Sequence, residues 1–180
     1  ALFAYGHRAL YNAYVVVGEV KMLLIDPRFK KNPYHYIIQC LLAVAFLAVI
    51  LLSLDAVFHA VMIASFGATS FIVFAMPRLK ICVPRRLIGG YVVGILCGVA
   101  CSAAYTAMAG GSDISILRGL FGALAIGTSI FLMTITNTEH PPAAGLALGL
   151  VYEGVDPMAL LVILLGVILL TAIKMLFKKY

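Results

Sequence analysis

The sequence predicts an all-α, polytopic membrane protein built as a bundle of about five transmembrane helices. Hydrophobic residues make up 64% of the 180 positions and charged residues only 11%, whereas a soluble domain carries about 25% charged residues. The mean hydropathy is +1.11. The charges also gather in short stretches, leaving apolar runs of about 20 residues, the length that crosses a hydrocarbon core roughly 30 Å thick.

Residues 1–30 are expected to form a separate N-terminal segment. Its apolar stretch, residues 10–25, includes Glu19 and Lys21, and each charge would cost on the order of 3 kcal/mol at the centre of a bilayer. We therefore expect an amphipathic helix that lies in the membrane interface. The segment lacks the pattern of a cleavable signal peptide. Residues 31–180 then form a single transmembrane domain.

The apolar runs and the breaks between them place the spans in order. Asp55 marks a tight turn, Pro77 and Pro84 bracket a basic loop, and residues 110–113 form a turn rich in Gly and Asp. The predicted spans cover residues 34–54, 56–76, 87–109, 116–137 and 158–177.

The positions of Lys and Arg predict the orientation. Of the thirteen, five precede the first span and four lie in the 78–86 loop, so we expect the N-terminus and this loop to be cytoplasmic. The fourth span would deliver Glu139 and His140 to the same side. Five crossings would place the C-terminal lysines, Lys174 among them, on the outer side. Either residues 142–151 cross as a short sixth segment, or the rule fails here.

A helix of ten residues covers only about 15 Å. For this reason we expect residues 142–151 to form a half-membrane or re-entrant helix rather than a full crossing. The side of the C-terminus stays open.

A proline-containing break ends the fourth span and begins this short helix. Proline has no N–H and a fixed φ, so Pro141 and Pro142 suit the first turn. Free N–H groups from Ala143 onward, together with the positive end of the helix dipole, would attract an anion. His140 could donate to an oxyanion or change its charge near neutral pH. An ordinary loop with a proline-capped helix and a satisfied histidine explains the same residues.

The basic loop is expected to face this helix start. Pro84 would open the third span, so a second helix N-terminus points to the same region. Arginine binds planar oxyanions bidentately, which makes Arg78, Arg85 and Arg86 candidate ligands, one of which would have to neutralise Glu139. The alternative is that these arginines only set the topology, as they would in any cytoplasmic loop.

Two further patterns lie within the spans. Hydroxyl side chains on one helix face can line a polar path, or they can bond to their own helix and to neighbouring helices. Small residues at every fourth position predict close helix packing, within the chain or between copies. The candidate polar residues are Thr69, Ser70, Thr136 and Asn137, and the candidate packing residues are Gly90, Gly94 and Gly98.

The sequence offers no arrangement typical of an enzyme: it has no HExxH motif, no phosphate-binding P-loop and no Ser-His-Asp spacing. The four cysteines form no CxxC pair and are expected to be structural. We therefore expect neither catalysis nor a bound metal or cofactor. The net charge of +6 fits loops that face anionic lipids better than it fits a nucleic-acid partner.

Three separated stretches resemble the HPP family of integral membrane proteins. They are Glu139-His140-Pro141-Pro142-Ala143-Ala144, Phe66-Gly67-Ala68-Thr69-Ser70 leading to Met76-Pro77, and Pro84-Arg85-Arg86-Leu87-Ile88-Gly89-Gly90. The resemblance covers residues 26–177 and implies spanning helices, about four in the family. It also implies nitrite as a substrate, in the plasma (inner) membrane of a prokaryote or in a plastid envelope. Many relatives carry His where this chain has Arg78.

Two functional hypotheses follow. The first is a membrane channel or transporter for a small inorganic anion, with nitrite supplied by the resemblance. The second is a non-transporting membrane scaffold or sensor that assembles as a homo-oligomer through its glycine-rich helix. The expected ligand-binding residues are His140, Glu139, Pro141, Pro142, Ala143, Arg85, Arg86, Arg78, Thr69, Ser70, Thr136 and Asn137.

Overall fold

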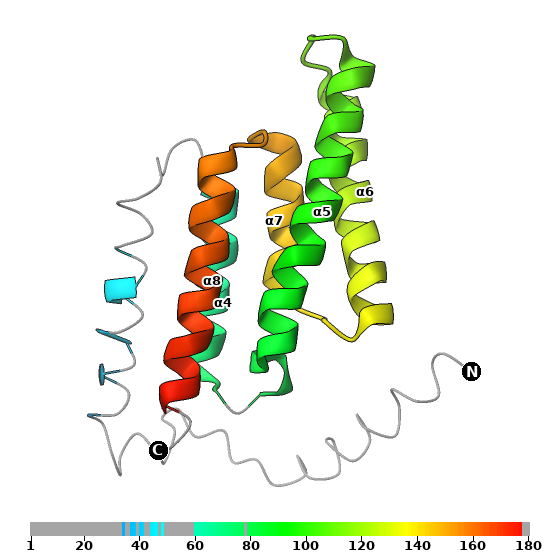
Figure 1. Ribbon diagram of the computed structural model, residues 1–180. Helices are drawn as coiled ribbons and strands as arrows, with labels where there is room; N and C mark the ends of the chain where they lie inside the picture. Colours follow the sequence, from blue (N-terminus) through cyan, green and yellow to red (C-terminus); the bar gives the residue numbers. More distant parts are fainter. Residues whose placement is uncertain are drawn as a thin grey trace, which may run out of the picture. The chain divides into compact units, whose positions relative to one another are not determined.

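The computed structural model describes residues 60–77 and 79–177, together with positions 34, 37, 38, 40, 41, 44–46 and 48. Among these residues every regular element is helical (Figure 1), as the sequence predicts. The expected interfacial segment 1–30, most of the expected first span, the turn at Asp55 and the candidate ligand Arg78 lie outside the described residues.

The described helices agree with the predicted spans to within a few residues. Those that are long and apolar enough to cross a membrane are Pro84–Ala109, Ser115–Thr136 and Pro157–Leu176. The first of them begins at Pro84, three residues before the predicted start, because the fixed φ of proline suits a first helical turn. The elements are α4 (Ala60–Ala75), the 3-10 helix η2 (Lys80–Cys82), α5 (Pro84–Ala109), α6 (Ser115–Thr136), α7 (Pro141–Tyr152) and α8 (Pro157–Phe177).

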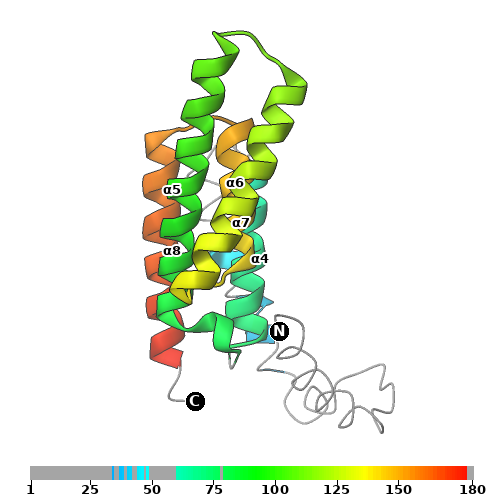
Figure 2. The same ribbon diagram turned by 90° about the vertical axis from the view of Figure 1, so that its right-hand side faces the viewer.

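The short helix α7 forms the centre of this bundle. It packs against α5, α6 and α4 (Figures 1 and 2), and eight of its twelve residues are buried. Leu146 and Leu150 of α7 join Phe66 of α4 and Leu87 of α5 in the main hydrophobic cluster. An apolar helix surrounded in this way meets other helices on most of its sides.

Contacts at the two ends of α7 define its path. At its start, the loop from α6 contacts Arg86 in the first turn of α5. At its end, Glu153 accepts a hydrogen bond from the amide of Val61, at the beginning of α4. The following helix, α8, runs back, and Lys174 near its end donates to the carbonyl of Cys82 in η2.

α7 leads away from the η2 end toward the start of α4, where α8 begins its way back, whereas α5 and α6 extend beyond this point (Figure 1). Its twelve residues correspond to about 18 Å, and α7 is not among the helices long enough to cross a membrane. Whether it re-enters or crosses the membrane stays a prediction. Lys174, near the end of α8, lies at the same end as the basic loop.

The glycine-rich face of α5 is filled by α7. A Cβ atom at Gly94 would lie 2.3 Å from the carbonyl oxygen of Ala143, and a Cβ at Gly90 would lie 2.5 Å from the Cβ of His140. A Cβ at Gly98 would lie 2.9 Å from the carbonyl of Ala147. The close packing that the glycines predict thus occurs within the chain.

Candidate functional site

His140 lies inside the bundle, recessed from the η2 end. It packs against Gly90, six residues after Pro84, which corresponds to about 9 Å along α5. Its other neighbour, Thr69, lies six residues before the end of α4 at Ala75. The histidine is fully buried. Because Gly90 has no side chain, the Cβ of His140 can occupy the space beside it.

A chain of hydroxyl groups holds the ring of His140. Its Nε2 is 2.9 Å from Thr69 Oγ1, which is 2.8 Å from the hydroxyl of Tyr91. The Tyr91 hydroxyl is 3.4 Å from Ser65 Oγ, and Ser65 donates to the carbonyl of Pro142. The network joins α4, α5 and α7 among apolar residues. Polar groups in such surroundings must find partners in the protein, since there is no water to supply them.

His140 is one of the residues that border a half-open cavity. Nδ1 is buried and has no hydrogen-bond partner among the described residues. The cavity lies between α6 and α7 and has a volume of about 410 Å³. The residues that line it are Ile126, Ile130, Met133, Thr134, Glu139, His140, Pro141, Ala144 and Gly145.

The charge of His140 follows from this burial. Desolvation disfavours the imidazolium and lowers the pKa of His140 to about 4. The ring is therefore neutral at every pH well above that value. A change of charge near neutral pH, which the sequence suggested, does not agree with this lowered pKa.

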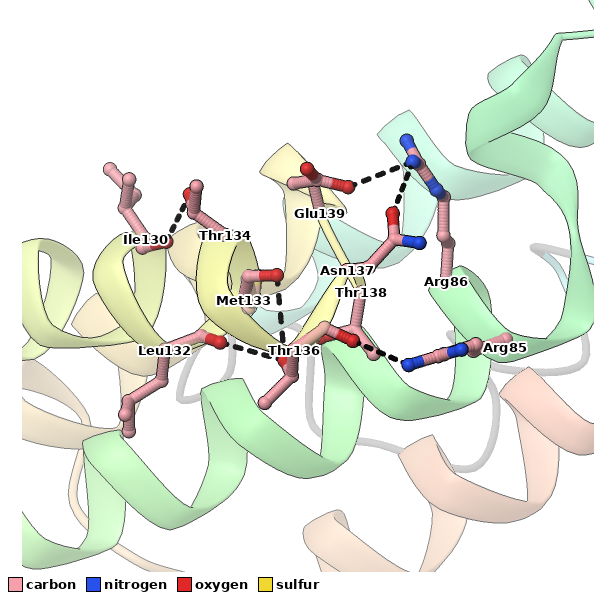
Figure 3. Close-up of polar contacts among 10 residues, drawn as sticks. All are labelled: Arg85, Arg86, Ile130, Leu132, Met133, Thr134, Thr136, Asn137, Thr138 and Glu139. Atoms are coloured by element: carbon pink, nitrogen blue, oxygen red, sulfur yellow. Dashed lines mark hydrogen bonds and ion pairs between the residues drawn. The ribbon is translucent and has the colours of Figure 1, made fainter. Parts of the chain in front are cut away.

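The arginines at the start of α5 bind the chain itself. Figure 3 shows both guanidinium groups reaching the end of α6 and the loop that follows. Arg85 donates to the carbonyl of Thr136 at 2.8 Å, where the last carbonyls and the negative dipole end of α6 attract a cation. Arg86 donates to Asn137 Oδ1 at 2.7 Å and pairs with Glu139 at 3.0 Å. Glu139 is thus neutralised, as an anion site would require.

The start of α7 has fewer free backbone N–H groups than the sequence predicts. Pro141 and Pro142 have no N–H, and the N–H of Ala143 donates to the carbonyl of His140 at 2.9 Å. The prediction of a free N–H at Ala143 is therefore wrong. The residue is also fully buried against Gly94. The dipole of the helix still favours negative charge there.

The remaining candidates divide between the site and the helix backbones. Thr69 is the direct partner of His140, whereas the hydroxyl of Ser70 donates to Phe66 in its own helix. The hydroxyl of Thr136 donates to Leu132 in α6. Asn137 has a φ of 56°, the left-handed conformation that asparagine tolerates, and this ends α6 and turns the chain toward His140.

Tyr91 is the site residue that the sequence reasoning missed. It is fully buried, and its ring centroid lies 5.6 Å from that of His140. A tyrosine within an apolar span carries a hydroxyl that needs a hydrogen-bond partner. This feature of the sequence could have indicated that Tyr91 belongs to a buried polar cluster. Among residues 60–77 and 79–177, no three His, Cys, Asp or Glu side chains gather closely enough to hold a metal ion.

We expect the Arg86–Glu139 pair to contribute little to stability, because the two side chains are 24% and 42% exposed. Arg86→Gln and Glu139→Gln should each lower the free energy of unfolding by about 0.2–1 kcal/mol. In the double variant the total loss should be little larger than the loss in either single variant. Thermal unfolding in detergent measures this. The Arg118–Asp113 pair, also at 3.0 Å, is the matched control. Fully additive losses would contradict the pairing.

The comparisons with known proteins agree with this architecture. The family model described as the transmembrane region of HPP matches residues 29–180. A transmembrane protein of Dictyostelium discoideum is 33% identical over 88 residues, which represent 49% of this chain and 29% of that relative. The chain therefore matches less than a third of the relative's length. No solved structure matches.

Proposed function

The chain belongs to the HPP family of transmembrane proteins, and on this premise we propose that it is a channel or transporter for a small inorganic anion, with nitrite as the first candidate. Its long apolar helices make it a multi-pass membrane protein. The HPP resemblance is what suggests nitrite. We propose transport rather than catalysis.

The observation that carries the proposal is the unpartnered Nδ1 of a fully buried histidine beside a cavity. An unsatisfied polar atom in an apolar bundle costs free energy, so its retention calls for a partner that arrives from outside. Polar residues inside membrane proteins commonly mark the path of a solute. Glu139, Thr134 and His140 are the polar side chains that line this cavity.

The scaffold hypothesis is less well supported. It requires the face formed by Gly90, Gly94 and Gly98 to meet a second copy of the chain, but α7 occupies that face. The half-open cavity that His140 borders is also compatible with transport. Assembly through another face would be compatible with either function.

We propose that the η2 end faces the cytoplasm, in the inner membrane of a prokaryote or in a plastid envelope. Lys80 and Arg85 lie at this end together with Lys174, and positive charge accumulates on the cytoplasmic side of membrane proteins. The His140 cavity would then open nearer to the cytoplasm, because the histidine is recessed only about 9 Å along α5.

Flux into liposomes tests the proposed function. Purified protein should carry nitrite faster than empty vesicles between about pH 5.5 and 8, and His140→Ala should lower this flux at least about tenfold, as expected for loss of a solute-contacting group. Arg118→Ala, at the opposite end of the bundle, is the control and should keep the flux. If nitrite, nitrate and chloride all fail to cross above background, the protein is not a transporter of small anions.

A further inference from the structure

Residues 137–139 form a short strap that leads from α6 to His140. The strap has no helical structure of its own and lies against the beginning of α5, where Arg86 contacts it (Figure 3). Further along α5, Thr138 meets Gly89, and His140 meets Gly90. The strap therefore lies along the stretch of α5 that separates His140 from the η2 end of the bundle.

His140 cannot be reached by a solute in this arrangement of the chain. The histidine is fully buried, although it borders the half-open cavity between α6 and α7. Glu139 of the strap borders the same cavity. All the other lining residues belong to the helices α6 and α7. A solute in the cavity contacts the imidazole only after part of this lining moves, and the strap is the part that lies outside the helices.

Polar contacts near the surface hold the strap on α5. Arg86 donates to Oδ1 of Asn137 and pairs with Glu139, the two outer residues of the strap. Arg85 holds the residue before the strap through the carbonyl of Thr136. Asn137 and Arg85 are exposed. Contacts between exposed groups add little to stability, because water competes for the same groups.

The strap has a single buried residue, Thr138. A Cβ at Gly89 would lie 2.7 Å from Cγ2 of Thr138, so this methyl group rests on the glycine. The Thr138 hydroxyl contacts the hydroxyl of Thr136, at 2.8 Å, at the end of α6. No strap residue belongs to the hydrophobic clusters of the described bundle. A segment with so few buried apolar contacts opens locally at a lower cost than the core does.

The structure on both sides of the strap is held more firmly. His140 itself is bound to Thr69, and the following helix is seated on the glycine face of α5. Before the strap, Met133 is the last buried residue of α6. Asn137, with its φ of 56°, is the turning point between α6 and the strap. A few residues at the end of an element can absorb such a movement.

On the premise of the function proposed above, we infer that the strap is a gate. While Arg85 and Arg86 hold it on the start of α5, the strap occludes His140. When these contacts open, the strap leaves Gly89 and the cavity extends to the histidine. The two arginines thus act on transport by setting how often the gate opens, and not by binding the anion.

A disulfide between the strap and α5 tests the gate directly. A Cβ at Gly89 would lie 3.3 Å from Cβ of Thr138, close to the separation of about 3.5–4.5 Å found in disulfides. Thr138→Cys also removes the methyl group that rests on this glycine. The double variant is made in a chain whose native cysteines are replaced by alanine; these are Cys40, Cys82, Cys97 and Cys101.

Oxidation of the Gly89→Cys, Thr138→Cys protein in vesicles should lower nitrite flux to the level of empty vesicles, and reduction of the same sample should restore it. The reduced sample is its own reference, so a general effect of the substitutions does not enter the comparison. Each single cysteine variant should carry nitrite equally well under both conditions. Equal flux in the oxidised and reduced double variant would overturn the gate.

Chemical modification of His140 tests the gate without transport. Diethyl pyrocarbonate reacts with a neutral imidazole that it can reach, and mass spectrometry identifies the modified residue. Arg86→Gln should raise the rate of modification by about 1.4- to 5-fold, the factor by which loss of an exposed ion pair shifts an equilibrium between open and closed states. Arg118→Gln, which removes the matched pair with Asp113, should leave the rate unchanged. An equal rise in both variants would mean that general loosening exposes the histidine, and would contradict the gate.

The same reagent separates the gate from the transport function. In the double cysteine variant, oxidation should slow the modification of His140 and reduction should restore it. If neither this protein nor the wild type carries nitrite above empty vesicles, the proposed function fails. The modification rates then still show whether the strap opens: a rate that does not depend on the disulfide overturns the gate, and a rate that falls on oxidation supports it.

Discussion

Replacing Gly94 by alanine is expected to lower the free energy of unfolding by about 3 kcal/mol, the upper part of the range for overpacking a closed core. The added methyl group would lie 2.3 Å from the carbonyl oxygen of Ala143. This oxygen belongs to the backbone of α7 and cannot rotate away. Since α7 also packs against α4 and α6, it cannot retreat without opening those contacts. Thermal unfolding in detergent, followed by circular dichroism, measures the loss.

Gly67→Ala provides the matched control for this substitution. Gly67 also lies within a helix, α4, but nothing stands within 4 Å of the position of its Cβ. The same methyl group should leave stability unchanged or raise it by up to about 1 kcal/mol, because alanine favours the helix. Equal melting temperatures for the two variants would show that α7 is not tightly seated on α5.

Thr69→Val is expected to have the second large effect on stability. Valine keeps the shape of the side chain and removes the hydroxyl that contacts both His140 and Tyr91. Each of these polar groups would be left short of a buried partner, at a cost of about 1–3 kcal/mol. The melting temperature should fall clearly, and nitrite flux should fall with it, because the ring of His140 loses the hydroxyl that holds it in place.

The neighbouring residue supplies the control. Ser70 is as fully buried as Thr69, but its hydroxyl donates only to Phe66 within α4. Ser70→Ala should therefore cost less than about 1 kcal/mol, since a bond back to the residue's own helix contributes little. A similar loss in both variants would mean that Thr69 is not the link between His140 and Tyr91.

Much of the fold could be predicted because a membrane imposes a simple rule of length. Runs of about 20 apolar residues identified α5, α6 and α8, and proline chemistry identified the start of α7 at Pro141. The path of α7 could not be obtained in this way. A helix of twelve residues is too short to be recognised by its apolar length. Its position depends instead on the glycine face of α5, against which it packs.

The site was predicted in its central residue but not in its chemistry. The break in the sequence singled out His140, and the charges suggested that an arginine would neutralise Glu139, as Arg86 does. The residue type indicated that Arg85 would donate to an oxygen atom. It did not indicate that this atom is the carbonyl oxygen of Thr136. The neutral state of His140 depends on burial by α4 and α5, which no local pattern reports.

The enclosed position of α7 also has a consequence for how the protein is made. At about 18 Å, α7 is too short to be inserted by the translocation machinery as an independent span. The glycine face of α5 enters the membrane earlier, since residues 90–98 leave the ribosome before residues 141–152. Until α7 arrives, that face lacks the helix that fills it in the folded bundle. Within this bundle the central helix α7 is thus made only after α4, α5 and α6, the helices against which it packs.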